Sequence, residues 1–191
     1  FTTFQDLGRP GHGIDGVSRA GAADPLALRI GNRLLGNPDN AVALEMTLLG
    51  GTFHFPDGGE IALCGARPES LPHNEVIAVP AGQTIRVGAL NGGARCYLCV
   101  RGGFDAPKIA GSSSTHVLSG LGPPPVRKGD ILSVAAPQLP PRRTPVPPAL
   151  TTYRHLLRVT KGPQADTLPA ADFYAAEYEV SPDSNRMGIR L

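Results

Sequence analysis

The residue types that can do chemistry gather in short stretches of this sequence. The first stretch, residues 8–16, carries Arg9 and His12 among its glycines. It lacks the G-x-x-x-x-G-K-[ST] order of a phosphate-binding loop, but its glycines let the backbone come close to a bound anion. Two interpretations stay open: Arg9 and His12 contact an anion, or the stretch is a tight turn with solvated polar residues.

A run of hydroxyl side chains, residues 111–115 with the sequence GSSST, forms the second stretch. One interpretation is a serine nucleophile like that of amidases with a Ser-Ser-Lys relay, since Lys108 is near, although the G-x-S-x-G motif is absent. Another is a cradle of hydroxyls and backbone N–H groups for a carboxylate or phosphate. The third is a polar surface loop, the ordinary place for serine-rich stretches.

Glu45 is the third candidate because of the face on which it lies. It alternates with Leu44 and Met46, so the pattern places Glu45 and Thr47 on the polar face of a predicted strand. If that face lines a cavity, Glu45 is a candidate acid or base. If the face meets water, Glu45 is an ordinary surface residue.

The cysteines and histidines predict neither a redox centre nor a metal site. The odd number of cysteines, which are Cys64, Cys96 and Cys99, argues against a disulfide framework and favours a reducing compartment. Cys96 and Cys99 match C-x-x-C, but in a predicted strand residues three apart point to opposite faces, so we interpret them as buried core residues. The five histidines show no metal-ligand spacing, and we predict no metal.

The elements that position these residues are mainly strands. Hydrophobic residues make up 41% of the 191 residues and charged residues 18%, which excludes a charge-driven disordered chain. One helix is predicted near 25–36, with Asp24 as its N-cap and Pro25 in its first position. Period-two patterns predict strands at 44–48, 52–55, 60–64, 75–79, 83–88, 94–101 and 130–134.

The chain is expected to contain two lobes. We predict a β-rich lobe at 1–135, a proline-rich linker at 136–150, and the start of a second β-rich lobe at 151–191, which we expect to be incomplete. Within that second lobe the pattern predicts a strand at 154–160 and a short helix at 170–177. A net charge of +2 without charge blocks argues against nucleic acid or an anionic membrane as partner.

Nine stretches, taken in order, resemble one known family. They are residues 1–11, 18–28, 32–37, 43–48, 92–98, 101–104, 111–115, 128–132 and 184–191. On these motifs the chain resembles the biotin-dependent carboxyltransferase-like family, also called allophanate hydrolase subunit 2, to which the C subunit of 5-oxoprolinase belongs. The family's serine loop usually reads Gly-Ser-Arg-Ser-Thr, whereas Ser113 stands here in place of the arginine.

The resemblance implies a fold and a function. The fold is mainly β, a cyclophilin-like β-barrel with one N-terminal helix and a second subdomain that is truncated here. The function is that of the C subunit in a cytoplasmic, ATP-dependent 5-oxoprolinase, which opens 5-oxoproline to L-glutamate. The implied partners are a sister subunit related to the sporulation kinase-inhibitor protein and a third oxoprolinase subunit. ATP with magnesium is required at the level of the complex.

Two alternative functions follow from the same resemblance. One is a biotin-dependent carboxyltransferase acting on urea or a similar amide, with biotin carried elsewhere. The other is a non-catalytic antagonist of a kinase-inhibitor protein. The residues that we expect to act on a small-molecule substrate are Glu45 and His12 as catalytic groups, and Arg9, Ser112, Ser114, Thr115 and Arg186 as substrate or anion contacts.

Overall fold

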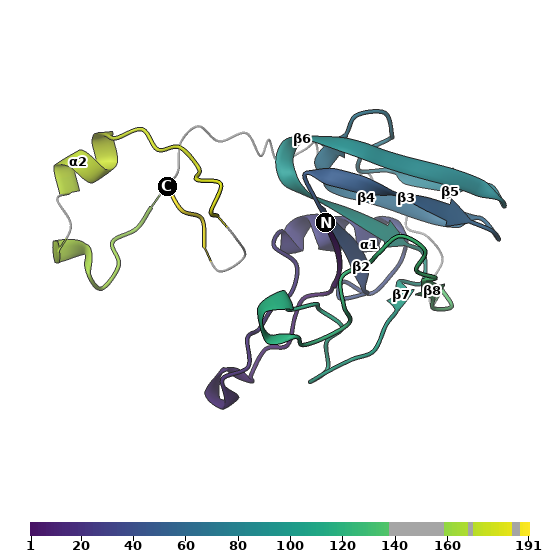
Figure 1. Ribbon diagram of the computed structural model, residues 1–191, viewed down its shortest axis with the longest axis horizontal. Helices are drawn as coiled ribbons and strands as arrows, with labels where there is room; N and C mark the ends of the chain where they lie inside the picture. The colour runs from purple at the N-terminus through teal and green to yellow at the C-terminus, as the bar shows by residue number, and fades with distance from the viewer. Residues whose placement is uncertain (138–158, 168–169, 185–187) are drawn as a thin grey trace. The chain divides into compact units, whose positions relative to one another are not determined.

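The computed structural model describes residues 1–137, 159–167, 170–184 and 188–191 of the chain (Figure 1). The chain divides into two compact units, Phe1–Tyr153 and Arg154–Leu191. All of the candidate residues except Arg186 lie in the described part of the first unit.

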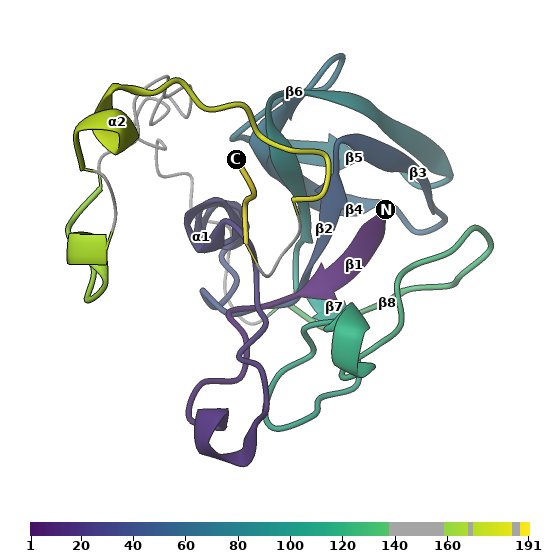
Figure 2. The same ribbon diagram turned by 60° about the vertical axis from the view of Figure 1, so that its left-hand side comes forward.

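A six-stranded antiparallel sheet is the main element of the first unit. Its strands are β1 (Thr2–Gln5), β2 (Ala43–Thr47), β3 (Leu49–Phe55), β4 (Gly59–Pro68), β5 (Val76–Val79) and β6 (Gln83–Val100). Their order is β1-β2-β6-β4-β5, and β3 pairs with β6 (Figures 1 and 2). Every strand predicted between residues 44 and 101 is present. The four-residue β1 was not predicted, because its run is too short for a period-two pattern.

The central strand β6 unites two strands that the sequence predicted separately. Gly88, at the end of the first, and Gly92, between the two, adopt positive φ and let the strand bend while pairing continues. The register against β4 shifts between Gly65 and Arg67, and Arg67 then faces Asn91. A bulge of this kind bends and twists a strand pair without ending it.

Helix α1 (Pro25–Leu34) begins as predicted. The Asp24 side chain accepts hydrogen bonds from the N–H groups of Leu26 and Ala27, at 3.1 and 3.0 Å, and so caps the helix. The helix ends at Leu34, slightly before the predicted boundary, and packs against β4 and β6. Asn37 secures the chain beyond it, because its amide donates to the Val100 carbonyl at 2.8 Å.

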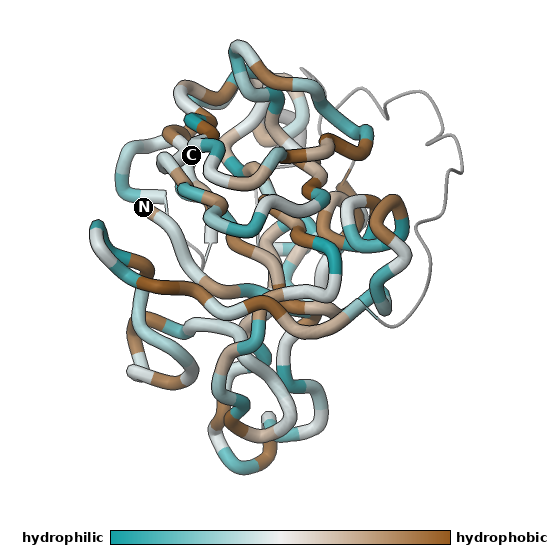
Figure 3. Tube along the Cα trace, turned by 90° about the vertical axis from the view of Figure 1, so that its right-hand side faces the viewer, coloured by the Kyte–Doolittle hydropathy of each residue, from teal (hydrophilic) through white to brown (hydrophobic). Residues whose placement is uncertain are grey.

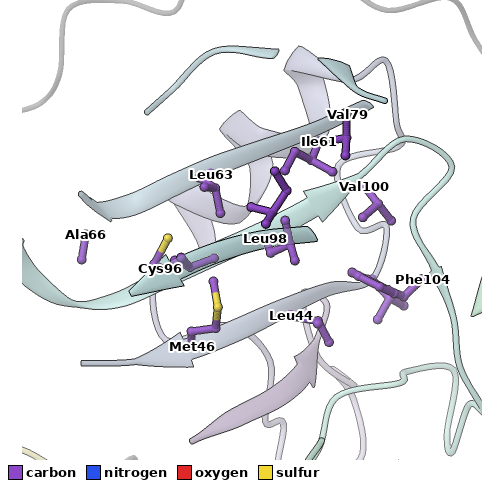
Figure 4. Packing of buried hydrophobic residues seen from close by; sticks show 13 residues of the cluster. Leu44, Met46, Ile61, Leu63, Ala66, Val79, Cys96, Leu98, Val100 and Phe104 are labelled. Atoms are coloured by element: carbon purple, nitrogen blue, oxygen red, sulfur yellow. The ribbon is translucent and has the colours of Figure 1, made fainter. Parts of the chain in front are cut away.

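The sheet has a buried apolar cluster on each face. One contains Leu44, Met46, Leu63, Cys96 and Leu98, and Figure 4 shows Met46 and Cys96 side by side. The other lies under α1, and its members include Leu28, Leu35, Ala43, Cys64, Tyr97 and Cys99.

The C-x-x-C pair is therefore divided between the two faces of β6, as predicted. All three cysteines are free and buried. Burial raises the pKa of Cys96 to about 12 and raises the pKa values of Cys64 and Cys99 well above the usual range. These thiols are core residues rather than a reactive pair.

The remaining elements are short. A second sheet pairs β7 (Phe104–Asp105) with β8 (Ser133–Val134), and 3₁₀ turns lie at η1 (Gly13–Asp15) and η2 (Val117–Ser119). The second unit contains η3 (Ala165–Thr167) and α2 (Ala170–Ala175), the latter within the helix predicted at 170–177. The predicted strand at 154–160 and the linker at 136–150 lie mostly outside the described residues.

The prediction of a mainly β fold is confirmed, but the described strands do not close into a barrel. β1 and β5 stand at opposite ends of the strand order, and no pairing joins them among the described residues.

In Figure 3, hydrophobic and hydrophilic segments alternate along the trace. Among the described residues, none of the helices has the length and apolar character that crossing a membrane requires.

Candidate functional site

The serine loop, residues 111–115, lies against the end of β1. The Thr115 N–H donates to the Phe4 carbonyl at 2.9 Å, and the Gln5 amide donates to the Thr115 carbonyl at 3.1 Å. These bonds join two stretches that stand far apart in the sequence. They place the hydroxyls of the serine loop beside residues 6–9, which follow β1.

The serine loop closes around the Asp6 carboxylate. Oδ1 of Asp6 accepts hydrogen bonds from Ser112 Oγ and Ser114 Oγ, both at 2.6 Å, and from the Gly8 N–H at 2.7 Å. Oδ2 accepts from the Ser113 N–H at 2.8 Å. We call Asp6 and residues 112–114 the serine cradle. All four residues are buried.

The donors of the serine cradle keep Asp6 ionised. Burial alone would raise the pKa of the Asp6 carboxyl, but the hydrogen bonds from Ser112 and Ser114, together with those from two backbone N–H groups, outweigh burial and lower it. The cradle therefore already holds an anion, and that anion is a side chain of the protein itself.

Asp6 was missed by the sequence analysis, although one signal was present. An aspartate two residues before a glycine commonly forms an Asx turn, and here Asp6 accepts from the Gly8 N–H. Of the three interpretations of the serine loop, a cradle of hydroxyl and N–H donors matches the geometry, but the carboxylate in it belongs to Asp6, and binding of a ligand there stays a prediction. The other hydroxyls of the loop bond elsewhere: Ser113 Oγ donates to the Ala106 carbonyl and Thr115 Oγ1 to the Pro123 carbonyl, each at 2.8 Å.

Arg9 is buried beside the serine cradle, and only 1% of it is exposed. Its Nη2 donates to the Ser114 carbonyl at 2.6 Å, and its Nε donates to the Ile109 carbonyl at 3.2 Å. Nη1 is buried and has no hydrogen-bond partner among the described residues. The guanidinium thus contacts two neutral amide carbonyls and keeps one nitrogen unpaired.

Glu45 takes part in a second buried network, at the start of α1. Its Oε2 accepts from the Tyr97 hydroxyl at 2.7 Å and from the Ala23 N–H at 2.9 Å. Oε1 lies 3.5 Å from Arg95 Nε. The Tyr97 hydroxyl also accepts from the Asp24 N–H at 2.7 Å, so Glu45 and Tyr97 together tie the N-terminus of α1 to the sheet.

The face of β2 that carries Glu45 therefore does not meet open water, because Glu45 is only 2% exposed. Burial, with the nearby Glu45 carboxylate, raises the pKa of Tyr97 far above its usual range. The two networks meet at neighbouring residues. The Ala22 N–H donates to the Asp6 carbonyl at 2.8 Å, and the next N–H donates to Glu45.

The structure thus brings together Arg9, Ser112, Ser114 and Thr115, and it adds Asp6 to them. His12 precedes an exposed turn, and the contact shown for its side chain is with Asp15, whose Oδ2 lies 3.6 Å from His12 Nδ1. Arg186 is outside the described residues, so its predicted role is untested. Within the part of the chain that the structure describes, no three His, Cys, Asp or Glu side chains gather as they would around a metal ion.

Comparison with known proteins gives a consistent picture. Residues 15–191 match the family described as "Carboxyltransferase domain, subdomain A and B". The chain is 36% identical over 203 aligned residues to the 5-oxoprolinase C subunit of Escherichia coli K12. That alignment covers 100% of this chain and 65% of the relative, so the chain spans less than two thirds of the relative's length.

Much longer proteins contain a similar region. Urea amidolyase of Lachancea kluyveri is 31% identical, and the alignment covers 100% of this chain but 12% of that protein. The crystal structure of the Kluyveromyces lactis urea amidolyase is also similar, with a TM-score of 0.79 and 29% identity. The matched region covers 99% of this chain and 13% of the K. lactis protein chain.

Proposed function

Since the chain belongs to the family of carboxyltransferase domains with subdomains A and B, we propose that it works as the C subunit of an ATP-dependent 5-oxoprolinase. The observation that carries the proposal is the alignment of the whole chain with the E. coli protein of that name. A protein of the same name from Haemophilus influenzae is 32% identical, over 99% of this chain. In both relatives the matched region is the larger part of a separate subunit.

The proposed reaction opens the lactam of 5-oxoproline to L-glutamate in a cytoplasmic complex. The other members are a sister subunit related to the sporulation kinase-inhibitor protein and a third oxoprolinase subunit. An unactivated amide resists hydrolysis, so the reaction needs energy from ATP and donors directed at the charge that develops on the carbonyl oxygen.

The serine cradle does not fit a phosphate group. Its Ser112 and Ser114 hydroxyls and its Ser113 N–H already bond to Asp6, and a phosphate in their place would meet the buried aspartate. We therefore assign ATP and magnesium to another part of the complex. The catalytic roles of Glu45 and His12 remain predictions, and the contacts of Glu45 to Tyr97 and Ala23 give it a structural role in addition.

A second candidate function is transfer of a carboxyl group from carboxybiotin to urea or a similar amide. The similarity of nearly the whole chain to the K. lactis urea amidolyase favours it. In that case biotin would be carried by another protein or domain, because the sequence has no Met-Lys-Met motif for its attachment.

The deciding experiment measures glutamate release from 5-oxoproline by the intact protein, purified together with its two proposed partners, with and without ATP. ATP-dependent release that disappears when this protein is omitted supports the 5-oxoprolinase. A folded complex that releases no glutamate but carboxylates urea from carboxybiotin supports the second function. A complex that catalyses neither reaction contradicts both and supports the antagonist.

A further inference from the structure

The unpaired nitrogen of Arg9 is the starting observation. Two of the three guanidinium nitrogens donate to backbone amide carbonyls, at Ser114 and Ile109, while Nη1 is buried without a partner among the described residues. Buried donors are nearly always hydrogen-bonded in folded proteins, so we expect Nη1 to bind an acceptor. The two carbonyls show which acceptor this guanidinium already binds, namely the oxygen of a neutral amide.

The charges around Arg9 favour a neutral acceptor as well. The ionised Asp6 connects to Arg9 through one residue, since Ser114 donates its hydroxyl to Asp6 and accepts from Arg9 at its carbonyl. One buried negative charge therefore accompanies one buried positive charge. A carboxylate ligand would add a second negative charge here, whereas an amide carbonyl leaves the pair balanced.

We propose that Arg9 Nη1 binds the carbonyl oxygen of an amide substrate, and that Asp6 sets the preference for a neutral ligand over an anion. The inference rests on the proposed function, in which the amide is the lactam of 5-oxoproline. Urea presents the same carbonyl chemistry, so the second candidate function is also compatible with it. A guanidinium bonded to that oxygen polarises the carbonyl and stabilises the negative charge that forms there during attack.

A ligand reaches Nη1 only when a loop moves aside, because Arg9 is 1% exposed. The two loops that flank it each contain a glycine turn with open space on one side. Gly11 and Gly111 adopt φ values of +92° and +78°, and a Cβ added at either would meet nothing within 4 Å. The turn at Gly111 is closed by two backbone hydrogen bonds between Ile109 and Ser112, so opening it costs these bonds, whereas no atom blocks the open side of either turn.

The test separates the two halves of the substrate. The probes are 2-pyrrolidone, which has the lactam without the carboxylate, and cyclopentanecarboxylate, which has the carboxylate without the lactam. Both are titrated by calorimetry into the complex of the intact protein, either wild type or R9K. We expect R9K to bind 2-pyrrolidone at least about tenfold more weakly, because lysine lacks the planar fork. Binding of cyclopentanecarboxylate should be unchanged.

The matched control is R33K, because Arg33 is exposed and pairs with Asp39 at 2.7 Å. R33K should bind both probes as wild type does. A measurement on the wild type guards against misfolding of R9K: in arginine-labelled protein, 2-pyrrolidone should shift the NMR signals of the Arg9 guanidinium and not those of Arg33. Absence of that shift, or equal 2-pyrrolidone affinity in wild type and R9K, overturns the proposal.

Asp6→Asn tests the charge balance. Removing the negative charge should raise the affinity for cyclopentanecarboxylate relative to 2-pyrrolidone by about tenfold, a change of selectivity that loosened packing alone does not produce. If both affinities fall in proportion, the specificity role of Asp6 is refuted. If cyclopentanecarboxylate binding to the wild type depends on Arg9, the ligand is an anion and the proposal fails.

Failure of the inference and failure of the proposed function give different results. If the complex releases glutamate but wild type and R9K bind 2-pyrrolidone equally well, the inference is overturned and the proposed 5-oxoprolinase function is not affected. If 2-pyrrolidone binds through Arg9 but the complex does not open 5-oxoproline, the inference is supported and the proposed function is contradicted. If urea then competes with 2-pyrrolidone for binding, the result favours the second candidate function, carboxyl transfer.

Discussion

At the scale of single residues, Asp6 changes the meaning of the serine loop. The sequence offered four consecutive hydroxyls as candidate substrate contacts, but two of them, on Ser112 and Ser114, bond to Asp6. A buried carboxylate that accepts this many hydrogen bonds is stable as an anion, and it holds its donors in place. The same bonds position the Ser114 carbonyl that receives Arg9.

Asp6→Asn should lower the free energy of unfolding by about 1–3 kcal/mol at pH 7, because the Asn Nδ2 would face the Ser113 N–H and leave both donors unpaired. The pKa of Asp6 is lowered in the folded state from 3.8. Its contribution is therefore present above about pH 4 and is lost as the pH falls through the folded value.

Urea unfolding of both proteins across this pH range measures the difference. Asp15→Asn is the control, since the Asp15 carboxylate is exposed on a turn. A difference between wild type and Asp6→Asn that stays constant below pH 4 would contradict the role assigned to the ionised carboxylate.

Tyr97→Phe should lower the free energy of unfolding by about 1–3 kcal/mol, because the lost hydroxyl serves two buried partners. It donates to Glu45 and accepts from the Asp24 N–H, and phenylalanine can do neither. Chemical denaturation gives the value, with Tyr174→Phe as a control at an exposed tyrosine. Equal losses in the two variants would show that the network at α1 contributes little.

At the scale of elements, helix α1 is placed on the sheet by a glycine. An added Cβ at Gly31 would lie 2.5 Å from Cys99 Sγ and 3.3 Å from Cys64 Sγ. The helix therefore approaches the sheet as closely as the two thiols allow. Propensity alone would favour alanine here, so the packing of α1 rather than its local preference explains the glycine.

Gly31→Ala should destabilise the protein by about 1–2 kcal/mol, although the same change in an exposed helix stabilises by about 1 kcal/mol. Cys99→Ala removes the obstructing sulfur, so the double variant should lose less than the sum of the two single losses, with a coupling of about 1 kcal/mol. A double-mutant cycle from urea unfolding measures this coupling, and strict additivity would mean that the contact carries no strain.

At the scale of the whole molecule, the sheet separates two apolar layers, one of which buries Cys96 and the other Cys64 and Cys99. Cys96 lies on one face of β6 and Cys99 on the other, so a reagent that reaches all the thiols must pass into both layers. High pKa values keep the buried thiols protonated at neutral pH, which further lowers their reactivity.

Native protein should therefore react with dithionitrobenzoate at pH 8 at least about a hundredfold more slowly than free cysteine, at a rate set by opening of the fold. In denaturant, Cys64, Cys96 and Cys99 should all react at once. Absorbance of the released thiolate follows both reactions. Rapid labelling of one thiol in the native state would show that one of the layers is open to solvent.

The sequence by itself determined the local elements of this protein. Strand alternation, the Asp24 cap of α1 and the division of Cys96 and Cys99 between faces all depend on neighbours in the chain, so pattern sufficed to predict them. The continuity of β6 and the absence of barrel closure among the described strands were decided by pairing between strands, which local patterns do not encode.

Only the tertiary structure decided what the site residues contact. Ser112 and Asp6 lie 106 positions apart, and nothing in either stretch specifies the other. The same is true of Arg9, whose carbonyl partners come from the loop around Ile109 and Ser114. A side chain's charge and hydrogen-bonding groups are set by its type, but whether those groups are already used depends on what folding brings beside it.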